Sequence, residues 1–146
     1  GATKSDVIQL EGGDRVALRS YGSMGYAGML AFIYAEMDME DPRLQSALKW
    51  LQGNYTLEEN PGMQAQGLFY YYHTMAKALS IAQINNLKTP DGKIVNWRKD
   101  LALKIMSTQD KDGSWINDGS NRWMEDDEVL VSSYALLALE HIFRGL

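Results

Sequence analysis

The segment from Gln109 to Trp115, which reads Gln-Asp-Lys-Asp-Gly-Ser-Trp, most constrains the fold because it joins two helical segments of different kinds. Before it, residues 97–108 place apolar side chains on one face, as a surface helix does. After it, residues 129–143 are apolar nearly all round, which is typical of a helix packed on several sides. A glutamine at a helix end, a turn with glycine and a tryptophan just beyond it predict a packed joint between two helices.

Helical segments of these two kinds alternate along the whole chain. Segments 21–37, 64–84 and 125–143 carry few charges and are predicted to be buried, inner helices. Segments 41–54 and 97–108 are amphipathic, and the first opens on an Asp-Pro pair that suits a helix start. Repeated hairpins of this kind predict an all-α fold, a partial or half ring of helical hairpins called an α/α toroid.

The chain divides into two predicted parts. Residues 1–20 lack helical periodicity, and the strand-like segments 7–8 and 16–18 flank a turn signal at 11–14, which predicts an irregular segment or a short β-hairpin. Residues 21–146 form the toroid part. Three inner helices are too few for a ring of the usual size, so we expect an N-terminal half or another chain to supply the remaining part.

Composition excludes some classes of partner. The net charge is -5 and no block of Lys or Arg occurs, which argues against nucleic acid binding. No cysteine is present, so disulfides and thiolate metal ligands are absent. No apolar run approaches the ~20 residues that span a bilayer. We predict no cofactor and no transmembrane segment, and the choice between cytoplasm and export stays open.

The segment from Ile105 to Trp115 resembles the QW motif of the squalene cyclase and protein prenyltransferase superfamily. It has an aliphatic residue, then Gln109, Gly113 and Trp115 at the spacing of that motif. Four further stretches resemble the C-terminal part of bacterial prenyltransferase and squalene oxidase repeat proteins: Arg19–Gly28, Glu59–Met63, Gln66–His73 and Arg122–Asp126.

The resemblance covers residues 19–146 and implies an α/α toroid. It also implies that Gln109 caps a neighbouring helix end while Trp115 stacks over the joint, so the motif has a structural role. The superfamily contains cyclases, transferases and non-enzymatic binding domains, and the fold alone does not choose among them.

The acid of class II terpene cyclases, the middle Asp of an Asp-x-Asp-Asp motif, has no clear counterpart here. Residues 38–41 have a similar look, but Asp41 is expected to cap a helix. If Tyr134 matches the position that follows the acidic pair in these enzymes, the acids are replaced by Ser132 and Ser133. Cyclase chemistry in its familiar form is therefore not predicted.

Three side chains are weak candidates for catalysis: Glu125, Asp126 and His73. The two carboxylates precede an inner helix, where acidic residues also complement the helix dipole. Protein prenyltransferases hold zinc with Asp, Cys and His, and this chain has no Cys, so no metal site is predicted.

The starts of the inner helices are the predicted ligand-binding region. All inner helices of a ring run the same way, so their first residues meet at one mouth of the lumen. The aromatic run 69–73 adds side chains that face either the lumen or the core. The candidate ligand-binding residues are Tyr21, Gln66, Tyr70, Tyr71, His73, Arg122, Trp123 and Asp126.

Three functions follow from these patterns. The first is a module that binds a small ligand or another protein, because the cyclase acid and the zinc cysteine are missing. The second is a terpene cyclase or prenyltransferase-like enzyme, with an isoprenoid among lumen aromatics. The third is a glycan-processing enzyme that uses Glu125 and Asp126, whose carboxyl groups would have to lie about 5–10 Å apart.

Overall fold

The computed structural model describes residues 7–9, 16–18 and 20–145, and these residues are mostly helical. None of the helices in these ranges is both long and apolar enough to cross a membrane. The described helices are α1 (Gly22–Tyr34), α2 (Pro42–Gly53), α3 (Leu68–Ile81), α4 (Trp97–Ser107), the single 3-10 turn η1 (Arg122–Met124) and α5 (Glu128–Phe143).

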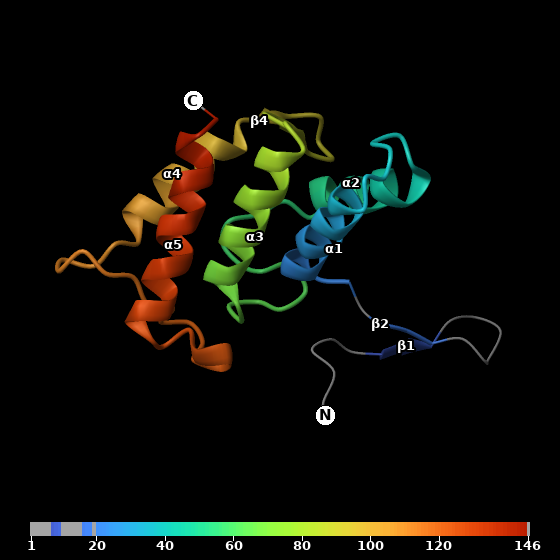
Figure 1. Ribbon diagram of the computed structural model, residues 1–146. Coiled ribbons are helices and arrows are strands. Elements are labelled where there is room, and N and C mark those ends of the chain that lie inside the picture. The colour runs from blue at the N-terminus through green and yellow to red at the C-terminus, as the bar shows by residue number, and fades with distance from the viewer. Residues whose placement is uncertain (1–6, 10–15, 19, 146) are drawn as a thin grey trace.

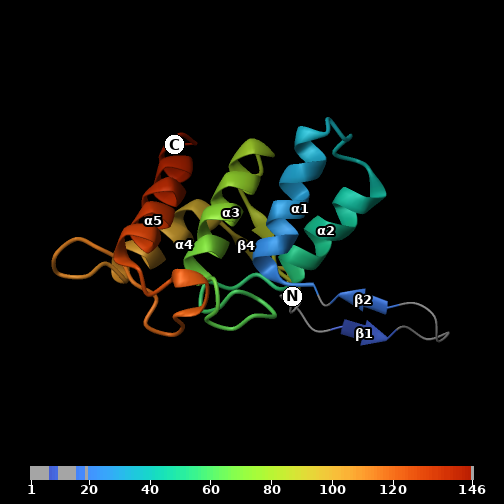
Figure 2. The ribbon, with the colours of Figure 1, turned by 60° about the horizontal axis from the view of Figure 1, so that its bottom comes forward.

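The helices form two layers (Figure 1). In one layer α1, α3 and α5 lie side by side and run the same way, with α3 in the middle. In the other layer α2 packs on α1, and α4 packs on α5. Figure 2 shows that the N-terminal ends of α1, α3 and α5 lie on the same side of the molecule. The predicted alternation of inner and outer helices therefore corresponds to these two layers.

The predicted helix bounds hold best where local capping decides them. The α2 helix begins after Asp41, whose carboxylate accepts from the backbone N–H of Arg43, as its Asp-Pro start predicts. By contrast, α3 begins at Leu68 rather than at Gln64, because Gln64 and Gly67 have positive φ values of 55° and 66°. These left-handed conformations are incompatible with a continuous right-handed helix.

Both strand pairs are short and antiparallel. The predicted N-terminal hairpin is confirmed in its strands, since β1 (Val7–Gln9) pairs with β2 (Val16–Leu18). Its turn lies outside the described residues. A second pair, β3 (Leu87–Lys88) with β4 (Ile94–Val95), surrounds residues 90–92. The sequence predicted only the turn there, because two-residue strands leave no periodicity to detect.

The three apolar helices differ in burial, whereas the sequence predicted that each is buried all round. The α3 helix is covered on both sides, by α1 and by α5. The α5 helix ends the row and exposes Val129, Leu136 and Phe143 by 78%, 58% and 76%. These residues recur every seven positions, so they form one apolar stripe along the helix. Among the described residues no helix covers this face, so the prediction of a helix buried all round is wrong for α5, and it is also wrong for α1, which exposes Tyr34 by 61%.

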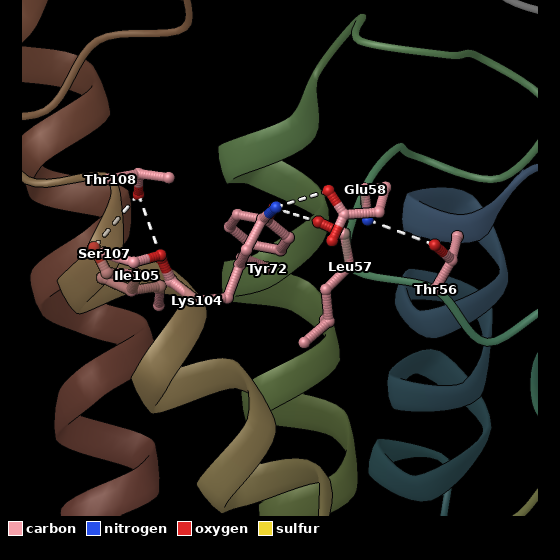
Figure 3. A network of polar contacts seen from close by, with 8 residues as sticks. All are labelled: Thr56, Leu57, Glu58, Tyr72, Lys104, Ile105, Ser107 and Thr108. Atoms are coloured by element: carbon pink, nitrogen blue, oxygen red, sulfur yellow. Dashed lines mark hydrogen bonds and ion pairs between the residues drawn. The ribbon is translucent and has the colours of Figure 1, made fainter.

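Side chains from α3 and α4 hold the loop that follows α2 (Figure 3). The hydroxyl of Tyr72 donates to the carbonyl of Leu57 at 2.5 Å, and Lys104 pairs with Glu58 at 2.6 Å. The neighbouring Tyr71 donates its hydroxyl to the carbonyl of Thr56 at 2.9 Å. Tyr71 and Tyr72 are each 1% exposed, so these two tyrosines belong to the core.

Candidate functional site

The QW-like motif forms a helix joint, but the roles of its residues differ from those that the resemblance implied. Trp115 is 5% exposed, and its indole N–H donates to the carbonyl of Ile105 at 2.8 Å, in the last turn of α4. Its backbone N–H donates to the hydroxyl of Ser132 in α5. Gln109 is exposed and donates to the carbonyl of Gly113 within its own turn. The tryptophan, rather than the glutamine, therefore supplies the side-chain donor for a carbonyl at the C-terminal end of α4.

A pocket of about 160 Å³ lies where α1, α3 and α5 begin. Each of the three helices, or the segment just before it, contributes to the wall, and four of the eight lining residues are aromatic. The pocket is lined by Tyr21, Ser23, Met24, Gly67, Tyr70, Trp123, Glu125 and Tyr134.

Glu125 is 1% exposed and closes the N-terminal end of α3. One carboxylate oxygen accepts from the backbone N–H of Tyr70 at 2.9 Å, and the other accepts from the side-chain amide of Asn117 at 2.6 Å. The N-cap residue of α3 is Gly67, which has no side chain to do this. Burial raises the pKa of Glu125, although its hydrogen bonds act in the opposite direction. Both oxygens of this candidate acid therefore already accept hydrogen bonds, and one of them caps α3.

The other two helix starts are also satisfied from within the protein. In α1, the backbone N–H of Ser23 donates to the buried side chain of Asn60 at 3.0 Å, and that of Gly22 donates to the carbonyl of Pro61. In α5, Asp127 accepts from the N–H groups of Val129 and Leu130, as an N-cap does. At least one first-turn amide of each of the three helices thus already donates to a protein acceptor, which weakens the attraction of the helix starts for a bound anion.

Trp123 reaches the pocket from a strained turn. It has φ 60° and the following Met124 has φ 64°, a left-handed conformation that residues with large side chains rarely adopt. The indole ring lies on Gly67, where an added Cβ would stand 3.2 Å from two ring atoms. The guanidinium of Arg122 lies 5.0 Å from the centre of the same ring. Gly67 thus makes room for the tryptophan at the start of α3.

Tyr70 and Tyr134 meet in the pocket wall, with ring centres 5.6 Å apart in an edge-to-face arrangement. His73 stacks on Tyr134 outside the pocket lining, 5.9 Å away, and lies 6.1 Å from His141. Burial, with added repulsion from His141 and Lys77, lowers the pKa of His73 to about 4. His73 is therefore neutral at neutral pH. Within residues 20–145, no group of three His, Asp or Glu side chains is placed to hold a metal ion.

The structure brings together three predicted ligand-binding residues, Tyr21, Tyr70 and Trp123, along with the catalytic candidate Glu125. The others lie elsewhere. Tyr71 is buried against the loop after α2, and Asp126 is exposed and outside the pocket lining. Three more predicted residues do not line the pocket. Gln66 is half-buried, His73 stacks on the ring of Tyr134, and the exposed Arg122 lies over the ring of Trp123.

Sequence reasoning missed Met24 and Tyr134 as residues of the pocket wall. Both lie within the first two turns of an apolar helix, at Gly22–Tyr34 and Glu128–Phe143. Counting every large side chain in those turns would have found them. The prediction considered only the first residues of each inner helix and the aromatic run 69–73. One sequence does not show which side of a helix faces the pocket.

The positions compared with the cyclase acid have other partners. Asp41 pairs with Arg43 at 2.8 Å, and this pairing lowers the pKa of Asp41 to about 2. The hydroxyl of Ser133 donates to the carbonyl of Val129, and that of Ser132 accepts from Trp115. These side chains stabilise local backbone.

A second pocket, of about 380 Å³, lies beside the motif between the C-terminal end of α4 and the start of α3. Gln109 and Asn117 both line it. Its rim consists largely of exposed polar residues, with Ser107 at the end of α4 and the loop residues Asp110 and Asp118 among them.

The first pocket offers aromatic rings, one thioether and a buried carboxylate whose oxygens are occupied. These groups suit contact with a ligand better than proton transfer to one. Neither a protein-family model nor a curated protein nor a solved structure matches this chain.

Proposed function

We propose that this chain is a binding module built as part of an α/α toroid, and that it holds a small ligand in the pocket at the starts of α1, α3 and α5. The observation that carries this proposal is the convergence of Tyr21, Tyr70 and Trp123 on one pocket from three separate helix starts. A mostly apolar wall with a few polar groups is the usual composition of a ligand site.

The two enzymatic alternatives receive less support from the same residues. Glycan processing by Glu125 and Asp126 needs both carboxylates beside the substrate, whereas only Glu125 lines the pocket. An isoprenoid cyclase needs an acid that reaches the substrate, and both Glu125 oxygens already accept hydrogen bonds. The aromatic wall is equally compatible with an isoprenoid that is bound without being transformed.

Ligand binding can be tested through the tryptophan indole signals in a nitrogen-proton NMR spectrum. We expect that at least one of farnesol, methyl β-glucoside and tetramethylammonium shifts the Trp123 signal. The indoles of Trp97 and Trp115 donate to backbone carbonyls and serve as internal controls that stay unchanged. The variant Tyr70→Ala should abolish the shift, while Tyr34→Ala, at a tyrosine that is 61% exposed, should not. If no probe moves the Trp123 signal, the proposal is wrong.

We also propose that a further helical hairpin covers the apolar stripe formed by Val129, Leu136 and Phe143. Figure 1 shows that α5 stands at the end of the row of α1, α3 and α5, and the exposed stripe is the kind of face that the next helix of a ring would cover. That hairpin would come from the remaining part of the toroid or from another chain.

The stripe predicts that this chain self-associates when no covering hairpin is present. We expect sedimentation velocity to show oligomers of the wild-type chain, and mainly monomer for the double variant Leu136→Glu and Phe143→Glu. The control is Ile94→Glu, because Ile94 is 60% exposed in β4 and lies outside the stripe. A wild-type chain that stays monomeric at high concentration, by sedimentation and by native mass spectrometry, contradicts this prediction.

A further inference from the structure

We infer that the pocket binds a quaternary ammonium group, either on a small free cation or on a head group such as phosphocholine. This inference rests on the proposed function, because it names the ligand of the same pocket.

Four of the eight residues that line the pocket are aromatic. Tyr21, Tyr70, Trp123 and Tyr134 all line a space of about 160 Å³, and Met24 adds a polarizable sulfur. The faces of such rings attract cations, and this attraction is used in proteins that recognise methylated ammonium ions. Trp123 already takes part in one such contact, because the Arg122 guanidinium lies 5.0 Å from its ring centre.

The charges of the wall favour a cation over an anion. Glu125 places a carboxylate in the lining, and the amides at the starts of α1, α3 and α5 already donate to protein acceptors. The segment from Arg122 to Glu128 carries four carboxylates against one guanidinium. An anion would therefore meet negative charge and would find first-turn helix amides that already donate to protein acceptors.

Methylation of the cation follows from the hydrogen bonds of Glu125. Each of its oxygens already accepts a bond, from the Tyr70 amide at 2.9 Å and from the Asn117 side chain at 2.6 Å. The backbone of Leu68 and of Phe69 also forms hydrogen bonds with Glu125, so the carboxylate supplies charge more than free acceptor positions. An ammonium ion with N–H groups would lose hydrogen bonds to water on entering, whereas a trimethylammonium group has none to lose.

The test compares choline with its uncharged isostere 3,3-dimethyl-1-butanol, using the Trp123 indole signal and calorimetry. We expect choline to bind about ten-fold more tightly, as cation–π attraction and one nearby carboxylate would give. Glu125→Gln should reduce this preference. Tyr134→Leu should weaken choline binding, and it leaves the cap on α3 untouched in case the Gln variant folds poorly. Tyr34→Ala is the matched control outside the pocket.

The outcomes separate this inference from the proposed function. Equal binding of choline and its isostere overturns the inference, and so does binding of farnesol or methyl β-glucoside without binding of choline, while the pocket remains a ligand site. If none of these probes binds, both proposals fail. Phosphocholine is measured in the same way to distinguish the two sources of the cation. If phosphocholine binds as tightly as choline, the ligand is a head group. If choline binds and phosphocholine does not, the ligand is a free cation. Either result supports the inference.

Discussion

Replacement of Trp115 by Ala is expected to lower the free energy of unfolding by about 3–5 kcal/mol, the usual cost of truncating a buried tryptophan. The side chain is 5% exposed and lies in the core. Its loss would remove packing between α4 and α5 and leave the carbonyl of Ile105 without the indole donor. Urea denaturation of the wild-type chain and the variant measures this difference, provided that the free energy of unfolding depends on urea concentration with the same slope in both.

Gln109→Ala is the matched comparison within the same motif. Gln109 is exposed and its side-chain amide donates to the Gly113 carbonyl within the same turn, so we expect a loss below about 1 kcal/mol. An equal loss for the two variants would mean that the glutamine, as the resemblance implied, also supports a helix end.

Glu125→Ala should cost about 2–4 kcal/mol, because two donors lose their acceptor in a buried place. These donors are the Tyr70 N–H at the start of α3 and the amide of Asn117. The cavity left by the side chain adds to the loss. Urea denaturation measures the total, and faster hydrogen exchange at the Tyr70 amide would locate the damage at the start of α3.

Asp126→Ala provides the control for this prediction, since Asp126 is the next carboxylate along the chain and is exposed. We expect a change within about 0.5 kcal/mol for this variant. If both substitutions cost the same, the effect of Glu125 comes from general loss of negative charge, and capping of α3 is not its role.

The features predicted well from the sequence depend on residues near one another in the chain. The α2 helix follows from the Asp41 cap and from one-faced periodicity, both of which operate within a few residues. The strands of the N-terminal hairpin follow from two short apolar segments around a turn signal. The starts of α3 and α5 were placed too early, because Gln64 and Gly67 are left-handed and Asp127 has the extended backbone of an N-cap residue, which interrupts otherwise helical sequence.

The candidate site was predicted in part, because helices that run the same way must begin at the same end. That argument found Tyr21, Tyr70 and Trp123. It placed Tyr71 with them, although successive helical residues point about 100° apart and Tyr71 turns into the core. The direction of a side chain depends on which neighbour covers each face of a helix, and this is decided by packing.

The sequence by itself determined the two kinds of helix, their order and the joint at residues 109–115, because apolar periodicity and capping act locally. Only the tertiary structure decided what the charged and aromatic side chains do. Glu125 accepts from the backbone N–H of Tyr70 and so caps α3, and Trp123 packs on Gly67. In each pair the two residues are more than fifty positions apart in the chain. Such contacts form only after the helices have packed, so no local pattern in the sequence indicates them.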